Sequence, residues 1–328
     1  MNSSNRFRSL VFALAALLVT SAVPAPAPAQ TPLVEVVFGV LNPTAAEWPL
    51  YIAQEQGYFK DEGLKITVVN GGSPQNVINL LATNAVNMAS DGTDSVMAAI
   101  SRGLAIKMVA PIFTVNPYSL VVASSINSWS DLKGKSVELG TKQDVTAIAF
   151  AKLAERQKMK IDDFSIVIGG NSVARYAALT SGNVQGAMLA QPFDIEAQSK
   201  GFKVLGTASD VIKNWSFTSV NINVAWGEKN RPLAVKVLRA MRRAVQYGYK
   251  NKEGAVAALV AEAKIDPVIA AKAYDIDFTK WKAFDPNMKL SQSDVEAVAK
   301  AQMEFGVLTA IPKWTDVYDG SYIAEATK

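Results

Sequence analysis

The 328-residue chain contains no cysteine and no histidine. Without cysteine, disulfides, zinc-thiolate sites, iron–sulfur clusters and lipid anchors attached to cysteine are excluded. Without histidine, the commonest general base and metal ligand is missing and a Ser-His-Asp triad is excluded. We therefore expect a protein that is not an enzyme, with no catalytic residue, no metal and no cofactor.

The first 29 residues have the pattern of a secretory signal peptide. Arg6 and Arg8 precede an apolar run at residues 10–19, and Ala27-Pro28-Ala29 fits a small-residue cleavage site. The apolar run is too short to cross a bilayer, which needs about 20 residues. Cleavage near Ala29 would remove two arginines and no acid, so the formal charge would fall from +4 to +2. We expect an exported periplasmic protein that binds no nucleic acid.

Apolar strand-like runs alternate with helical periodicity along the chain. Strands are expected at 34–40, 64–69 and 85–89, with helices at 48–59, 74–83 and 94–102, and a second run of this kind begins at 135–140. Such alternation predicts an α/β protein whose mostly parallel sheets are covered by helices on both faces. The length corresponds to about two domains.

An internal repeat supports two similarly wound lobes. Gly71-Gly72-Ser73 recurs 98 residues later as Gly169-Gly170-Asn171, and Asn84 recurs as Gly182 at the end of the following helix. We expect lobe 1 to comprise residues 30–117 plus 225–328 and lobe 2 to comprise 118–224. The β-rich stretches 118–124 and 217–226 predict two crossings, with a hinge near Asn116 and Asn223.

Three predicted strands end in a turn that opens a helix, at 71–74, 90–94 and 140–146. Free N–H groups and the positive end of the helix dipole make such turns favourable for anions. These turns supply hydroxyl, amide and carboxylate groups from Ser73, Asp91, Thr93, Thr141, Gln143, Asp144 and Thr146. Each group either contacts a ligand or only caps its own helix. Asp91 and Asp144 could accept from a cationic group or only complement the dipole.

A few further side chains have two interpretations. Trp48, Tyr118 and Trp215 either flank a ligand or lie in the core, and Gln191 either points into a cleft or caps a short helix. Arg175 could reach an anion, but a solvated helix face is the expected place for it.

Several motifs in order resemble a known family. They are Trp48-Pro49-Leu50-Tyr51-Ile52-Ala53, Gly57-Tyr58-Phe59-Lys60-Asp61-Glu62-Gly63-Leu64, Gly71-Gly72-Ser73, Asp131-Leu132-Lys133-Gly134-Lys135, residues 177–184 and Gln191-Pro192-Phe193. Over about residues 35–250 the chain resembles the type II solute-binding proteins of ABC importers. The similar branch is the one for taurine, aliphatic sulfonates, nitrate and thiamine-pyrimidine precursors.

This resemblance implies two doubly wound α/β lobes, joined by a two-strand hinge, that enclose one small ligand. It also implies handover to a membrane permease driven by an ATPase. Together with the turn residues, it gives the expected ligand-binding set: Asn42, Trp48, Ser73, Asp91, Thr93, Tyr118, Gln143, Asp144, Thr146 and Gln191. We expect a monomeric importer component that captures a small organic anion, either a sulfonate or a carboxylate, or a zwitterion. Two alternatives stay open: a secreted α/β enzyme or thiamine-precursor protein on the same fold, and a ligand-sensing domain for a membrane receptor.

Overall fold

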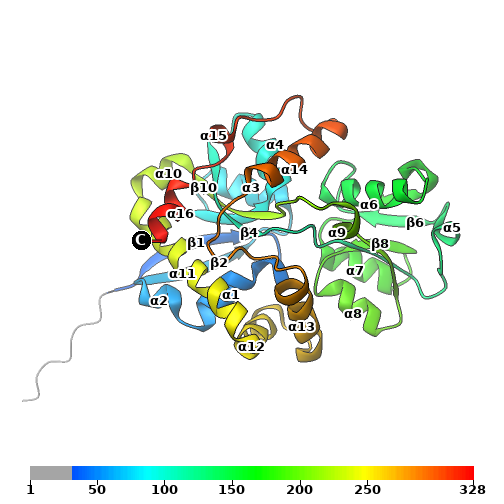
Figure 1. Ribbon diagram of the computed structural model, residues 1–328, viewed down its shortest axis with the longest axis horizontal. Helices are drawn as coiled ribbons and strands as arrows, with labels where there is room; N and C mark the ends of the chain where they lie inside the picture. The colour runs from blue at the N-terminus through cyan, green and yellow to red at the C-terminus, as the bar shows by residue number, and fades with distance from the viewer. Residues whose placement is uncertain (1–31) are drawn as a thin grey trace, which may run out of the picture. The chain divides into compact units, whose positions relative to one another are not determined.

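The computed structural model describes residues 32–328, so the expected signal peptide lies outside the described residues. Within this part the chain forms two five-stranded sheets, which are well separated in Figure 1. In spatial order, lobe 1 contains β2 (Leu64–Asn70), β1 (Val34–Val40), β3 (Met88–Gly92), β10 (Thr218–Asn223) and β4 (Ile106–Phe113). Lobe 2 contains β7 (Ser165–Ile168), β6 (Ser136–Leu139), β8 (Gly186–Leu189), β5 (Ser119–Val122) and β9 (Lys203–Thr207). The prediction of two α/β lobes is confirmed.

The two sheets have the same order and the same pairing directions. In each, the second strand in this order, β1 or β6, pairs in parallel with both of its neighbours, and the fourth strand, β10 or β5, pairs antiparallel with the third. That strand is β5 in lobe 2, which follows directly after β4, and β10 in lobe 1, which follows the whole of lobe 2. The chain therefore crosses between the sheets twice, between β4 and β5 and between β9 and β10.

The internal repeat is also present in three dimensions. Ser73 caps one helix by accepting from the Asn76 N–H, and Asn171 caps its counterpart by accepting from the Ala174 N–H. Asn84 and Gly182 follow those helices with φ of 58° and 79°. Both lie in the left-handed region, which glycine and asparagine tolerate best, so the repeated residues have repeated structural roles.

One expected domain boundary and one expected hinge residue differ from the structure. The sequence-based boundary at residue 224 put residues 218–223 in lobe 2, whereas β10 pairs with β3 and β4 in lobe 1. Asn223 therefore does not lie at a crossing: it pairs with Ile106 at the end of β10 and caps the next helix. Asn116 does lie in the first crossing. An apolar run predicts a strand but does not indicate which sheet it joins.

Helices cover both sheets. In lobe 1 they are α1 (Trp48–Glu55), α2 (Tyr58–Asp61), α3 (Pro74–Ala82) and α4 (Thr93–Ser101), preceded by a 3-10 turn at Ala45–Glu47. In lobe 2 they are α5 (Trp129–Leu132), α6 (Val145–Arg156), α7 (Ser172–Thr180), α8 (Phe193–Ser199) and α9 (Ala208–Val211), with a 3-10 turn at Ile161–Asp163.

The remaining helices form a C-terminal tail. They are α10 (Val224–Lys229), α11 (Arg231–Lys250), α12 (Lys252–Ala263), α13 (Pro267–Tyr274), a π-helical segment at Asp275–Lys280, α14 (Gln292–Glu304), α15 (Trp314–Val317) and α16 (Ser321–Ala326). Helix α11 packs against α1 and α14 against α4 of lobe 1, and α13 also contacts α8 of lobe 2. The tail thus covers lobe 1 and touches lobe 2.

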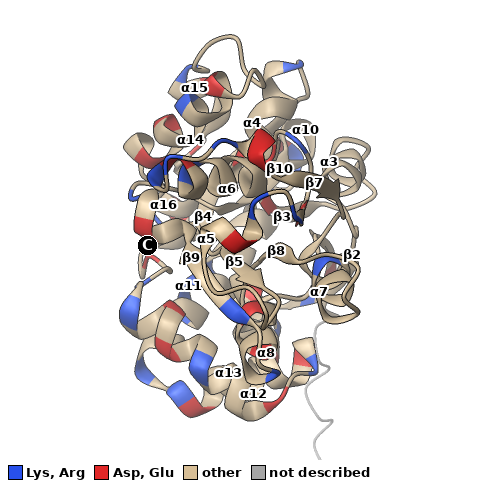
Figure 2. Cartoon of the chain, turned by 90° about the vertical axis from the view of Figure 1, so that its right-hand side faces the viewer, with Lys and Arg blue, Asp and Glu red and all other residues tan. Residues whose placement is uncertain are grey.

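The longest helix shows how the tail is fixed. Helix α11 has Pro232 in its first turn and a buried apolar stripe that includes Val237, Leu238 and Met241. Its opposite face carries Arg239 and Arg243, which form ion pairs with Glu62 and Asp61 at the end of α2. Basic and acidic residues are interspersed over the helices of the tail in Figure 2, without a large patch of one sign. Within residues 32–328, no helix combines the length and apolar character needed to cross a bilayer.

Candidate functional site

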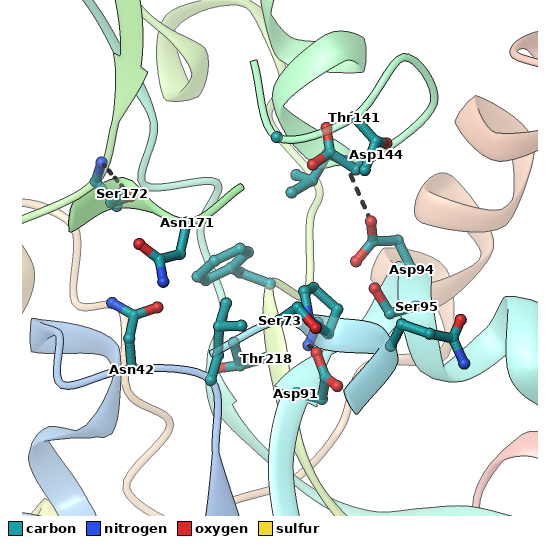
Figure 3. A pocket seen from close by; sticks show the side chains of 18 of the residues that line it. Asn42, Ser73, Asp91, Asp94, Ser95, Thr141, Asp144, Asn171, Ser172 and Thr218 are labelled. Carbon is teal, nitrogen blue, oxygen red and sulfur yellow. Dashed lines mark hydrogen bonds between the residues drawn. The ribbon is translucent and has the colours of Figure 1, made fainter. Parts of the chain in front are cut away.

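A cavity of about 410 Å³ lies between the lobes. Its walls are the turns that follow β1, β2 and β3 in lobe 1 and β6, β7 and β8 in lobe 2, together with the two crossings. Ligands of open α/β sheets bind at these carboxyl ends of the strands, and the volume lies within the range of small-molecule sites. Figure 3 shows Asn42 of lobe 1 and Asn171 of lobe 2 pointing toward one another across this cavity.

Hydrogen bonds join the lobes around the cavity. They run from Ala45 N to Gln191 O (3.4 Å), Asn171 Nδ2 to Gly72 O (3.2 Å), Val145 N to Asp94 Oδ2 (3.2 Å) and Gln143 Nε2 to Phe305 O (3.2 Å). Lys152 of α6 also forms an ion pair of 3.0 Å with Glu304 of α14. The lobes are therefore closed upon each other.

Six of the ten residues expected to bind ligand line this cavity: Asn42, Ser73, Asp91, Tyr118, Gln143 and Asp144. Two of them also cap helices, because Ser73 Oγ accepts from the α3 backbone and Asp144 Oδ1 accepts from the N–H groups of Thr146 and Ala147 in α6. Thr141 lines the cavity as well. Direct ligand contact by these residues stays a prediction.

The other four expected residues are not among those that line the cavity. Trp48 is buried in the lobe 1 core, where its Nε1 donates to Ala255 O at 2.6 Å and its ring packs edge-on against Tyr274 and Phe278. Gln191 is buried beside Asp194, to which its amide donates at 3.4 Å.

Thr93 and Thr146 have local structural roles. The Thr93 N–H donates to Phe217 O at 2.8 Å, which ties the start of α4 to the second crossing. Thr146 Oγ1 accepts from the Gly140 N–H at 2.8 Å and donates to Asp144, which fixes the turn that opens α6. A threonine in a helix-opening turn can hydrogen-bond either to the turn or to a ligand. Here the Thr93 N–H and the Thr146 hydroxyl form hydrogen bonds within the protein.

Arg175 was expected on a solvated helix face, and this expectation is wrong. It lines the cavity with an exposed fraction of only 2%. Its guanidinium donates to Met188 O at 2.7 Å, to Ser172 Oγ at 3.1 Å and to Gly170 O, and it lies 5.5 Å from the centre of the Tyr118 ring. A signal was present in the sequence, because an arginine in the first turn of a helix opposes the helix dipole and needs a compensating role.

Further lining residues were also missed by the sequence analysis: Glu47, Asp94, Asn171, Ser172, Thr218 and Gln302. Glu47 ends the 3-10 turn after β1, and Asp94 is the last residue of the expected turn at 90–94, but neither was singled out as a ligand residue. Thr218 and Gln302 come from β10 and α14. They reach the cavity because β10 joins the lobe 1 sheet and α14 packs on α4. The return of the tail to lobe 1 was expected, but no local pattern indicates which of its side chains line the cavity.

Burial raises the pKa of the carboxyl groups on the lobe 1 wall. The pKa of Glu47 is raised to about 7 by loss of hydration, against a smaller opposing effect of the hydrogen bond from Ser90. Loss of hydration raises the pKa of Asp91 well above its usual value. The pKa of Asp94 is raised to about 6 by burial and then by the nearby charge of Asp144. The site can thus bind through hydrogen bonds and charge, and Glu47 can exchange a proton near neutral pH.

Solved structures with this fold include binding proteins of import systems and a desulfurization enzyme. The structure resembles the periplasmic aliphatic sulphonate binding protein SsuA of Escherichia coli with a TM-score of 0.68, 18% identity and coverage of 86% of this chain and 90% of that one. It resembles the periplasmic nitrate-binding protein NrtA of Synechocystis with a TM-score of 0.74, 14% identity and coverage of 90% and 88%. At these identities the likeness establishes the type II periplasmic binding protein fold.

Curated relatives correct one expectation. A 4-amino-5-hydroxymethyl-2-methylpyrimidine phosphate synthase of Saccharomyces cerevisiae is 29% identical over 139 residues, which cover 41% of this chain and 40% of the synthase. The expectation that the chain is not an enzyme is contradicted by these relatives, which are named as enzymes, because absence of histidine and cysteine lowers the expectation of catalysis without excluding it. The match spans well under half of the synthase.

A family model extends over more of the chain. It matches residues 45–255, which include both crossings and all of lobe 2. The chain belongs to the NMT1/THI5 like family.

Proposed function

We propose that this chain is the solute-binding component of an ABC importer, exported to the periplasm and processed near Ala29. It captures a small organic solute with an acidic group, a sulfonate or a carboxylate, by closing its lobes around it. The observation that carries this proposal is the cavity of about 410 Å³ whose walls come from both lobes and whose rim is closed by hydrogen bonds between them. A ligand that contacts both walls binds the closed state better and shifts the population toward it.

Arg175 is the group suited to the acid of the ligand. Its guanidinium is fixed by its bonds to Gly170, Ser172 and Met188, and it has five N–H donors, so donors remain for an anion. A fixed guanidinium matches the geometry of a carboxylate or sulfonate and loses little freedom on binding. Handover to a permease and ATPase follows from the proposed role.

The experiment is a thermal-shift screen of the processed protein with sulfonates, carboxylates and amino acids, followed by calorimetry of the hits. A ligand at 100 times its Kd stabilises the protein by about 2.7 kcal/mol. Small-angle scattering with and without a hit should show a decrease in radius of gyration. Absence of binding tighter than about 1 mM across the screen would contradict a solute-binding role.

A second candidate is catalysis on a pyrimidine-containing compound in the same cavity. The named activity of the relatives and the pKa of Glu47 near 7 favour it, since a base works best when its pKa lies near the working pH. Incubating the protein with each hit and analysing the mixture by mass spectrometry separates the candidates. A new product that disappears in Glu47→Gln would support catalysis, and recovery of the unchanged compound would support transport.

A further inference from the structure

Unpartnered polar atoms concentrate on one wall of the cavity. Five lining side chains, each at least nine-tenths buried, have an atom with no hydrogen-bond partner among the described residues: Asn42 Nδ2, Glu47 Oε2, Asp91 Oδ2, Thr218 Oγ1 and Gln302 Oε1. All five belong to lobe 1 or the tail that covers it. Because buried polar groups are nearly always paired in folded proteins, such a cluster at a cavity points to a ligand.

The atoms in this cluster are mostly acceptors. Glu47 uses its other oxygen to accept from Ser90 Oγ at 2.7 Å, and Asp91 uses its other oxygen to accept from the Gly92 N–H at 2.6 Å. Two carboxylate oxygens and the Gln302 carbonyl oxygen thus remain as acceptors, against one amide donor from Asn42 and a hydroxyl that can do either. The complementary group on a ligand must carry several hydrogen-bond donors, as a protonated nitrogen does.

The charged residues around the cavity also favour a cationic group on the ligand. Around the cavity lie four acids, Glu47, Asp91, Asp94 and Asp144, and two cations, Arg102 and Arg175. Arg175 donates to Gly170, Ser172 and Met188 on the opposite wall, and none of the ion pairs found within residues 32–328 includes any of the four acids. Buried carboxyl groups without a partner cation are costly unless a proton or another cation neutralises them.

We propose that the lobe 1 wall binds a protonated nitrogen of the solute, an ammonium or an amidinium, through Asp91 and Glu47. This inference rests on the proposed function and adds the class of solute. The solute is a zwitterion that spans the cavity, with its basic nitrogen toward lobe 1 and its acid toward Arg175 of lobe 2. Such a solute contacts both walls with opposite charges, so closure satisfies both ends at once.

Proton release on binding provides a further readout. Burial raises the pKa of Glu47 to about 7, so part of this group is protonated at neutral pH, and burial also raises the pKa of Asp91; a bound cation lowers both pKa values again. Binding of a cation is therefore accompanied by proton release, whereas binding of a plain anion is not. Calorimetry in two buffers with different ionisation enthalpies measures the number of protons released.

The test uses pairs of probes that differ only in the nitrogen. Taurine and isethionate, and β-alanine and 3-hydroxypropanoate, each exchange an ammonium group for a hydroxyl; the same exchange is made on every hit of the thermal-shift screen. We expect the ammonium member to bind at least tenfold more tightly and to release protons. In Asp91→Asn the preference should fall to less than threefold, and Glu47→Gln serves as a second variant if Asp91→Asn does not fold.

The control is Asp162→Asn, an exposed acid of lobe 2, which should keep the full preference. Hits that bind equally well with the nitrogen replaced, or a preference unchanged in both cavity variants, would overturn the inference and leave the solute-binding role intact. A screen without any hit would instead reject the solute-binding role, and the inference with it.

Discussion

Replacing Asp194 by asparagine should remove much of the pH dependence of stability near neutrality. Asp194, at the start of α8, is buried, and it accepts from Ser119 Oγ at 2.9 Å and from the Ile195 N–H at 2.8 Å. Loss of hydration raises its pKa from 3.8 to about 7, against the smaller lowering by these hydrogen bonds. The folded state therefore holds a proton that the unfolded chain releases at lower pH.

The sign and the size follow from proton linkage. Between pH 4 and 7 the folded state binds more protons than the unfolded state, so the free energy of unfolding is highest below pH 4 with respect to this group and falls as pH rises. A pKa difference of about 3 units at 1.4 kcal/mol each sets an upper limit of about 4 kcal/mol. Since buried sites relax and admit water on ionisation, we expect about 2 to 4 kcal/mol.

The assay is urea unfolding at several pH values between 4 and 8, followed by tryptophan fluorescence. In Asp194→Asn the amide keeps the shape of the protonated acid, and its carbonyl oxygen can accept from Ser119, so the loss between pH 4 and 7 should shrink by the amount above. Asp162→Asn is the exposed control and should behave like the wild type. If the free energy of unfolding depends on pH in the same way in wild type and Asp194→Asn, the raised pKa of Asp194 is refuted. The other acids with raised pKa values are present in both proteins and cannot account for a difference.

Three further outcomes are expected. Trp48→Phe should lower the free energy of unfolding by about 1 to 3 kcal/mol, because it removes the buried hydrogen bond from the indole to Ala255 O and leaves a cavity in the core, while ligand Kd stays within twofold; weaker binding at unchanged stability would place Trp48 at the ligand after all. Arg175→Lys should weaken ligand binding by at least tenfold in calorimetry, because a single ammonium cannot replace the fork that reaches Gly170, Ser172 and Met188; unchanged binding would contradict its role. Gln143→Ala should weaken binding two- to fivefold without changing the melting temperature of the unliganded protein, because the bond to Phe305 O is made between lobes, and an equal loss of both would mark it as a general stabiliser.

Local patterns were sufficient to predict much of the fold. The repeated glycine pairs and the caps at Ser73 and Asn171 predicted two similar lobes. Such features can be recognised in the sequence because a cap or a left-handed residue bonds only to residues a few positions away. The cavity residues at the turns after β2, β3 and β6 followed from the general position of ligand sites in α/β sheets, and Asn42 after β1 followed from the family resemblance.

The remaining features depend on contacts between distant segments. The partner sheet of β10 is decided by the strand exchange, and Gln302 reaches the cavity because α14 packs on α4. Trp48 was assigned to the ligand through the family resemblance, but Ala255, whose carbonyl oxygen accepts from its indole, lies 207 residues away. A side chain's direction in such cases follows from packing that its neighbours in sequence do not specify.

The helix starts explain how the lobes close and where the acid of a ligand can lie. The positive N-terminal ends of α4 and α6 meet between the lobes, and like ends of helix dipoles repel. Asp94, in the first turn of α4, accepts from the Val145 N–H at the start of α6, and Asp144 caps α6 itself, so the protein's own carboxylates occupy this place. A ligand's acid therefore gains little at the starts of α4 and α6, two of the three helix starts that the sequence analysis favoured. Arg175 is the fixed, buried cation of the cavity, and so the acid of a bound solute belongs on the lobe 2 wall.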